Sequence, residues 1–363
     1  MKLGAEKEIL LNGLQAVQNI ITTKAALPIL SNVLIETQGN NIRLTATDLD
    51  VGISCVVPVD IQEQGAITVP AKKFSEIIRE LPGDNLSITT KKNNLVIIET
   101  EACQFKIMGL PREEFPKLPE FKDKEAIKLN QAELKQMLNL TYFAASFDET
   151  RYILNGVLFK VNKNSLILVA TDGKRLAVIE KKLNQGADTE LDIIVPIKTI
   201  HELNRNLKDD GELSLVRGNN QVLFDLGGTM IISRIIEGEF PDYQQVVPPV
   251  SDNKMKVKRT KVLLAVKRAS LLSTPDYQAV KFEVFKNKLV VSKSTPDMGE
   301  SREEVAIDYQ GKEMVIGFNP NYLIDVLKNL SQEEIEMELT DSEKPGVVRT
   351  DGYVYIVLPM RLS

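Results

Sequence analysis

The chain has 363 residues, of which 43% are hydrophobic and 26% charged, with a formal net charge of −5. Hydrophobic cores stop growing near ~250–300 residues, so this length predicts two or three domains. The composition excludes disordered, collagen-like and membrane-embedded proteins, and the negative charge excludes bulk attraction to nucleic acid, so any DNA contact must be local.

The start of the chain, Met1–Glu6, has no apolar signal-peptide region, and no apolar run approaches the ~20 residues of a membrane helix. We therefore expect a cytoplasmic protein with no membrane partner. Only two cysteines occur, Cys55 and Cys103, each within a strand-like apolar run. They are expected to be buried free thiols, and the sequence predicts neither a metal site nor a cofactor.

The chain contains an internal repeat of about one third of its length. Four ordered matches lie 124 to 126 residues apart: Ile29–Ile35 with Ile153–Phe159, Ala46–Asp48 with Ala170–Asp172, Val69–Pro70 with Val195–Pro196, and Glu114–Pro116 with Glu239–Pro241. Chance does not produce four ordered matches at one spacing. A third copy is indicated near the end of the chain, where Leu358–Pro359 repeats Leu110–Pro111 at an offset of 248.

Amphipathic helices recur with the same period. Their apolar residues, spaced as on one face of a helix, are Phe74, Ile77, Ile78 and Leu81 in the first copy, Ile200, Leu203 and Leu207 in the second, and Leu323, Val326, Leu327 and Leu330 in the third. Another helix is predicted to begin at Asn130, because Glu133 follows three residues later as in a capping box. Three units of about 120 residues account for the whole length.

Linkers are predicted where proline and charge accumulate, at Phe115–Glu125 and Pro248–Lys256. The fold class is α+β, with three similar domains in series over residues 1–121, 127–249 and 253–363. Each is expected to pack two helices on antiparallel sheets.

Domains with exposed sheet edges can join head to tail, and a ring closes when the rotation per unit divides a circle. Three units in each of two chains give six units and twelve helices. If the helices line the inside at ~10 Å each, the clear bore is roughly 28 Å, wide enough for a hydrated duplex. Basic residues on the exposed faces of these helices predict contacts to phosphates, which permit sliding: Lys72, Lys73, Arg79, Lys198, Arg205, Lys261, Lys267, Arg268 and Lys328.

Several segments spread along the chain resemble landmarks of the bacterial sliding clamp family, the beta subunit of DNA polymerase III. They are Leu27–Leu30, Thr45–Asp48, Val69–Phe74, Arg151–Gly156, Ala170–Gly173, Phe240–Tyr243 and the terminal Leu358–Leu362. The resemblance implies three clamp domains per chain in a head-to-tail homodimer. It also implies a non-enzymatic processivity factor for DNA replication, which encircles duplex DNA without reading its sequence and tethers the replicative polymerase, the clamp loader and other clamp-motif proteins.

The resemblance also assigns residues to three sites. A peptide-binding groove for these proteins, here called the partner groove, would be lined by Leu154, Thr171, Gly173, Lys174, Arg175, Leu176, Pro241, Val246, Ile356, Leu358, Pro359, Met360, Arg361 and Leu362. Its apolar residues would form the anchor pocket, while Arg175 would hold polar atoms of the peptide. DNA would contact Lys24, Lys72, Arg79, Lys198 and Arg205. The dimer contact would place Phe105 against Leu271 and Leu272 of the second copy, with Lys73 opposite Asp297, Glu300, Glu303 and Glu304.

Two other interpretations stand beside this one. An enzyme would use Asp48 or Asp172 as a catalytic carboxylate, but the single histidine, His201, lies on a predicted helix, and the sequence has no phosphate loop and no metal-ligand spacing. We therefore expect turns at both aspartates and no catalytic residue. A repeat scaffold that binds peptides without encircling DNA would have the same groove and no basic bore.

Overall fold

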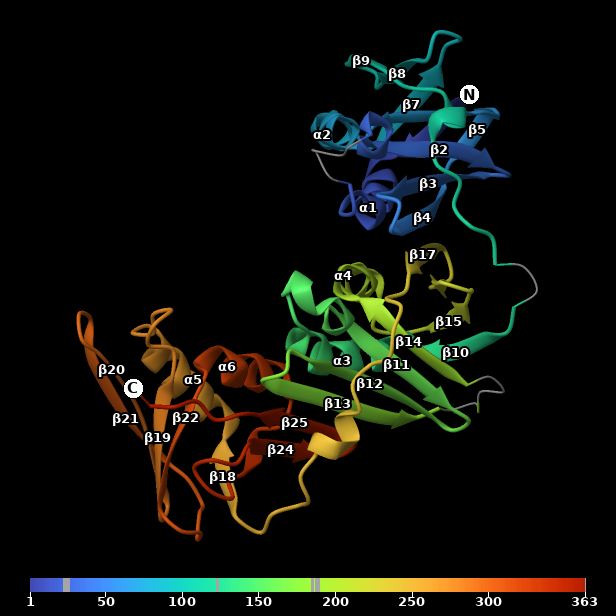
Figure 1. The fold of residues 1–363 in the computed structure, drawn as a ribbon. Helices are drawn as coiled ribbons and strands as arrows, with labels where there is room; N and C mark the ends of the chain where they lie inside the picture. The colour runs from blue at the N-terminus through green and yellow to red at the C-terminus, as the bar shows by residue number, and fades with distance from the viewer. Residues whose placement is uncertain (22–26, 122–123, 184–185, 187–189, 363) are drawn as a thin grey trace. The chain divides into compact units, whose positions relative to one another are not determined.

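The computed structural model describes residues 1–21, 27–121, 124–183, 186 and 190–362 (Figure 1). The chain forms two compact units. Unit 1 comprises Met1–Lys135 and Lys198–Ile235, and unit 2 comprises Gln136–Ile197 and Ile236–Ser363. Lys24, one of the expected DNA contacts, lies outside the described residues. Within those residues, no helix has the length and apolar character needed to span a membrane.

The helices of the described residues follow the predicted threefold repeat. They are α1 (Lys7–Gln18), α2 (Ala71–Glu80), α3 (Gln131–Thr141), α4 (Ile197–Asn206), α5 (Arg259–Ser270) and α6 (Pro320–Asn329). The apolar faces predicted for α2, α4 and α6 are buried. The cap predicted for α3 is confirmed, because the Glu133 N–H donates to Oδ1 of Asn130 at 3.0 Å.

Unit 1 contains two antiparallel sheets. The five-stranded sheet runs β5 (Asp60–Glu63), β1 (Lys2–Glu6), β7 (Asn85–Thr90), β8 (Leu95–Glu99), β9 (Gln104–Met108). The eight-stranded sheet runs β10 (Ala126–Asn130), β15 (Glu212–Arg217), β16 (Gln221–Asp225), β17 (Thr229–Arg234), β4 (Val51–Pro58), β3 (Asn41–Thr47), β2 (Asn32–Gln38), β6 (Ala66–Pro70). The first and second repeats are joined where β17 pairs with β4, with Ile232 opposite Gly52.

Unit 2 repeats this arrangement. Its eight-stranded sheet runs β14 (Leu191–Pro196), β11 (Gly156–Asn162), β12 (Ser165–Thr171), β13 (Arg175–Lys182), β25 (Tyr353–Val357), β24 (Gly346–Thr350), β23 (Glu334–Glu338), β18 (Lys254–Lys258). Its four-stranded sheet runs β21 (Gly299–Ala306), β20 (Lys288–Thr295), β19 (Val280–Phe285), β22 (Met314–Phe318). The second and third repeats are joined where β13 pairs with β25 (Figure 1), with Leu176 opposite Ile356.

The end of each repeat is marked by a single β-bridge to the strand that precedes its second helix. The three bridges pair Thr68 with Leu110, Ile194 with Ile236, and Gly317 with Met360. Met360 is therefore the structural counterpart of Leu110, and the sequence match of Leu110 with Leu358 is wrong by two residues. A short Leu-Pro match cannot reveal this, because the equivalence is set by backbone pairing.

The two cysteines correct a smaller expectation. Cys55 lies in β4, as predicted for a strand, but Cys103 lies in the turn between β8 and β9. Both thiols are free and half-buried rather than buried.

Candidate functional site

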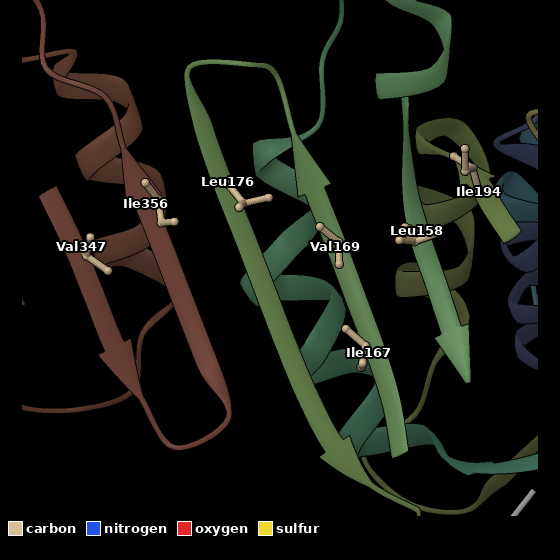
Figure 2. Close-up of a cluster of buried hydrophobic side chains, with 7 residues drawn as sticks. All are labelled: Leu158, Ile167, Val169, Leu176, Ile194, Val347 and Ile356. Atoms are coloured by element: carbon tan, nitrogen blue, oxygen red, sulfur yellow. The ribbon is translucent and has the colours of Figure 1, made fainter. Parts of the chain in front are cut away.

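A cluster of buried apolar side chains covers one face of the eight-stranded sheet of unit 2 (Figure 2). This apolar cluster consists of Leu158, Ile167, Val169, Leu176, Ile194, Val347 and Ile356. Because Leu176 and Ile356 lie opposite each other in β13 and β25, the cluster continues across the junction of the second and third repeats. It therefore provides an apolar floor shared by two domains, which is where ligand sites commonly form.

Five residues expected in the partner groove lie in or near this floor. Leu176 and Ile356 belong to the apolar cluster, and Thr171 pairs with Leu176 in the sheet. Leu358 follows β25, is 44% exposed, and donates its N–H to the carbonyl of Lys174 at 2.9 Å. Lys174 is exposed at the rim.

The rim itself is a turn built by Asp172. Its Oδ1 accepts hydrogen bonds from the N–H groups of Lys174 at 2.8 Å and Arg175 at 3.0 Å, and Gly173 has a positive φ of 85° that favours glycine. Asp48 forms the same kind of turn with the N–H groups of Asp50 and Val51. The two aspartates considered for catalysis thus have matching structural roles.

Other expected groove residues lie at its margins. Leu154 ends the 3-10 helix Glu149–Leu154, and its neighbour Ile153 is the residue that packs against the cluster. Pro241 and Val246 are exposed, whereas other residues of the same linker pack on the floor. The packing residues that sequence reasoning missed are Ile153, Val178, Ile236, Phe240, Tyr243, Val247 and Val354. Strand alternation could have found Val178 and Val354, each two residues from an assigned position.

The terminal residues lead away from the floor toward the four-stranded sheet. Pro359 is half-buried, and the Met360 N–H donates to the carbonyl of Gly317 in β22 at 2.8 Å. A Cβ on Gly317 would lie 2.9 Å from Cδ2 of Leu362, so Leu362 lies over this glycine. Arg361 is exposed. The tail therefore connects the floor to β22.

The structure corrects the role expected for Arg175. Its side chain is only 7% exposed and makes ion pairs with Asp172 at 3.0 Å and Asp325 at 2.7 Å. The guanidinium also lies 4.4 Å from the ring centroid of Tyr322. Because side chains alternate along a strand, Arg175 faces away from its neighbour Leu176 and the apolar floor. Its side chain thus ties β13 to α6 and is not placed to hold a peptide.

The electrostatics of this tie favour the charged guanidinium. Burial alone would lower the pKa of Arg175, but Tyr355 and the carboxylates of Asp325 and Asp172 raise that pKa above its usual value. The arginine therefore stays charged while it links the second repeat to the third.

Replacing Arg175 with alanine is expected to lower the free energy of unfolding by ~2 kcal/mol. Breaking a fully buried ion pair costs ~3–5 kcal/mol, and the effect is smaller here because Asp325 keeps contact with water at 34% side-chain exposure. Urea denaturation measures the change. The control is Lys254→Ala, which removes a pair with Glu336 that is nearly half exposed on both sides and should cost ~0–1 kcal/mol. Equal losses in both variants would show that Arg175 does not tie the repeats.

The residues expected to contact DNA differ in whether their charges are paired with carboxylates of the same chain. Lys72 and Arg79 are exposed on α2. Lys198 on α4 makes an ion pair with Asp48, and Arg205 pairs with Glu202 at 2.7 Å. Part of the positive charge expected on α4 is therefore compensated within the chain.

Two neighbouring groups on α4, His201 and Glu202, have shifted pKa values. Burial raises the pKa of Glu202 above its usual value even though Arg205 opposes the shift. Burial and the charge of Arg205 lower the pKa of His201, so this histidine adds no positive charge to the helix at neutral pH.

The expected dimer contacts lie at sheet edges and at the end of α5. Phe105 is 37% exposed on β9, the last strand of its sheet, and Leu271 after α5 is 74% exposed beside the half-buried Leu272. Asp297 is exposed in the turn before β21, and Glu300 is exposed at the start of β21. The apolar groups are thus available to a second chain.

Several of the charged residues assigned to the dimer already have partners within the chain. Lys73 pairs with Glu76 at 2.8 Å, Glu303 with Arg268 at 2.7 Å, and Glu304 with Arg302 at 2.9 Å. A second chain would therefore meet charges that are already paired within this chain, and the expected placement of Lys73 opposite the four acidic residues stays a prediction.

Within the described part of the chain, no group of three or more histidine, cysteine, aspartate or glutamate residues is arranged to hold a metal ion. The arrangement as a whole combines an apolar floor, unpaired sheet edges and exposed basic helix residues. These features suit the binding of macromolecules.

Comparison with known proteins gives matches along the whole chain. The models of the N-terminal, central and C-terminal domains of the DNA polymerase III beta subunit match residues 1–119, 128–242 and 244–361. The beta sliding clamp of Escherichia coli K12 is 34% identical over 367 residues, covering 100% of both chains. That of Chlamydia muridarum is 30% identical over 364 residues, covering 100% of this chain and 99% of the relative.

Solved structures give the same result. The DNA polymerase sliding clamp of Bacillus subtilis is similar with a TM-score of 0.94 at 31% identity. A sliding clamp of Pseudomonas aeruginosa bound to griselimycin is similar with a TM-score of 0.94 at 33% identity. Both comparisons cover 100% of each chain.

Proposed function

The chain belongs to the family of DNA polymerase III beta subunits, the beta sliding clamps, and from this we propose that its partner groove tethers the replicative polymerase, the clamp loader and other clamp-motif proteins to DNA. The protein is a sliding clamp, a non-enzymatic processivity factor of DNA replication with the three-domain clamp fold. It acts as a homodimeric ring around duplex DNA.

The observation that carries the ring is the pattern of sheets. Each eight-stranded sheet combines four strands of one repeat with four of the next. The five-stranded sheet of unit 1 and the four-stranded sheet of unit 2 are left without such a partner, and they end at β9 and β21. Three repeats make two junctions within the chain, so the third junction requires a second chain.

We place that third junction between β9 of one chain and β21 of the other. The pairing would give the five-stranded and the four-stranded sheet a partner from a neighbouring repeat, as in the two eight-stranded sheets. It would also cover the backbone N–H and C=O groups at the two sheet edges, which could otherwise pair with other chains and lead to aggregation. The exposed Phe105 and Leu271 would supply its apolar contacts. Two copies joined in this way close a ring of six domains.

The DNA contacts are proposed to be few and to involve phosphates. Lys72 and Arg79 on α2 carry charges that face solvent, whereas Lys198 and Arg205 must share theirs with Asp48 and Glu202. Because the chain has a net charge of −5, such contacts bind weakly. Retention on DNA then depends on the closed ring rather than on adhesion.

The partner groove is proposed on the floor formed by the apolar cluster. Support comes from the half-exposed Leu358, which is held to the carbonyl of Lys174 beside the floor. The related clamp from Pseudomonas aeruginosa binds griselimycin, so a clamp of this family has a site for such a ligand. A short peptide could insert apolar side chains there, as in other sites dominated by a few buried anchors.

Domain limits at residues 1–121, 127–249 and 253–363 are also proposed. The first limit is supported by the family matches, which end at 119 and begin again at 128, and both limits are supported by β10 and β18, each of which begins the strands of a new repeat. The family matches put the second limit earlier, at 242 and 244.

Sedimentation velocity of the unaltered protein tests the assembly. A dimer is expected at micromolar concentration. A monomer under those conditions would contradict the closed ring.

A further inference from the structure

A hollow of about 970 Å³ lies on the eight-stranded sheet of unit 1, beneath the linker Phe115–Phe121. Its sheet side includes Leu34, Arg43, Thr45, Leu223 and Ile232. These residues come from β2, β3, β16 and β17, so the hollow spans the junction of the first and second repeats.

The internal repeat relates this hollow to the partner groove position by position. Adding 124 to the residue numbers Leu34, Arg43, Thr45, Gly52, Leu223 and Ile232 gives Leu158, Ile167, Val169, Leu176, Val347 and Ile356, six of the seven members of the apolar cluster. The strand register agrees with this correspondence. Ile232 lies opposite Gly52 as Ile356 lies opposite Leu176, and Leu34 lies opposite Thr45 as Leu158 lies opposite Val169.

The two surfaces differ most at one position. The counterpart of Leu176 is Gly52, and a Cβ on Gly52 would collide with Cδ2 of Leu118 from the linker. The side chain of Leu118 therefore occupies the space that the side chain of Leu176 occupies in unit 2. The corresponding linker residue of unit 2, Tyr243, packs against the apolar cluster while Leu176 keeps its own place.

The sheet surface of the hollow in unit 1 is also more polar than the apolar cluster of unit 2. Arg43 replaces Ile167 and Thr45 replaces Val169. The Nε atom of Arg43 is buried without a hydrogen-bond partner among the described residues, so this surface carries an unsatisfied polar group where the partner groove carries an isoleucine.

We propose that this hollow is a second, internal counterpart of the partner groove, and that the chain's own linker blocks it to partner peptides through Leu118, which lies over Gly52. The inference rests on the proposed function of the partner groove. Its consequence is that each chain binds partners at one groove, although the repeat builds two.

Tethering explains why the linker would prevail over a partner peptide. A segment attached through a short linker has an effective concentration on the order of millimolar. A peptide at micromolar concentration with the same intrinsic affinity would therefore occupy the site in only about one chain in a thousand. The polar residues Arg43 and Thr45 would further weaken the binding of an apolar peptide to this hollow.

The test counts peptides bound per chain by titration calorimetry, using a synthetic peptide of the polymerase tail. The unaltered protein should bind one peptide per chain, and Leu118→Ser should bind two, the second at least tenfold more weakly. Lys117→Ser, a neighbouring exposed linker residue, should still bind one. Gly52→Leu is the second variant, because a leucine on the sheet should displace Leu118 and give the same count without altering the linker sequence.

Hydrogen exchange of residues 115–121 shows whether the linker has been released. One peptide per chain in a folded variant with a released linker would overturn the proposal, and so would two per chain in the unaltered protein. Removing Met360–Ser363 in the Leu118→Ser background should leave only the second site. If the unaltered protein binds no peptide at all, the partner groove itself is refuted.

Discussion

Replacing Leu271 and Leu272 with alanine is expected to convert the dimer into monomers. Leu271 is 74% exposed in the single chain, so its apolar surface is available for burial by a second copy. In well-packed sites each Leu→Ala change costs ~2–5 kcal/mol. Two such losses would raise the dissociation constant of the dimer well above the micromolar concentration of the experiment. Sedimentation velocity at micromolar concentration measures the change.

The matched control is Leu264→Ala. Leu264 lies on the same helix α5 and is 46% exposed, but it is not among the proposed interface residues. This variant should remain a dimer. Persistence of the dimer in the double variant would place the third junction away from the end of α5.

Deleting Met360–Ser363 is expected to abolish binding of a short motif peptide while the dimer survives. Truncation in a buried apolar pocket commonly costs ~2 kcal/mol or more, which is about thirtyfold in affinity. The deletion removes the tail between Leu358 and β22, which is the opposite edge of the four-stranded sheet from β21, where the proposed dimer contact lies. Fluorescence polarisation with a labelled polymerase-tail peptide gives the affinity, beside a sedimentation run for the oligomeric state.

A narrower pair of variants separates groove contacts from general damage to the tail. Leu358→Ala removes a half-exposed side chain beside the floor and keeps the backbone hydrogen bond to Lys174. It should therefore also lower the affinity for the peptide. Removing Ser363 alone should have little effect. Undiminished affinity after the four-residue deletion would place the partner site elsewhere.

The repeat could be predicted from the sequence because its strongest constraints are local. Helix faces such as Phe74, Ile77 and Ile78 must be buried wherever the helix packs, and a turn after Ala-Thr needs an acceptor such as Asp48 or Asp172. Each copy keeps these residues because its helices bury the same face and its strands are joined by the same kind of turn.

The junctions between repeats could not be predicted in the same way. Pairing of β17 with β4 and of β13 with β25 depends on edges that lie far apart in the chain, and no residue pattern specifies such a partner. The Arg175 side chain points toward α6 as a result of that pairing, since its carboxylate partner Asp325 comes from the third repeat. The insertion of Leu118 over Gly52 likewise needs the linker to cross the sheet.

We infer that this protein holds DNA by surrounding it. The most direct measurement is retention on a nicked circle and on the same DNA after linearisation, at salt that abolishes ordinary phosphate contacts. A loaded ring should stay on the circle, because its release does not depend on counterion exchange, and it should leave the linear molecule through the free ends. Equal retention on circular and linear DNA would contradict encirclement, and no retention on either would favour a peptide-binding scaffold without a DNA role.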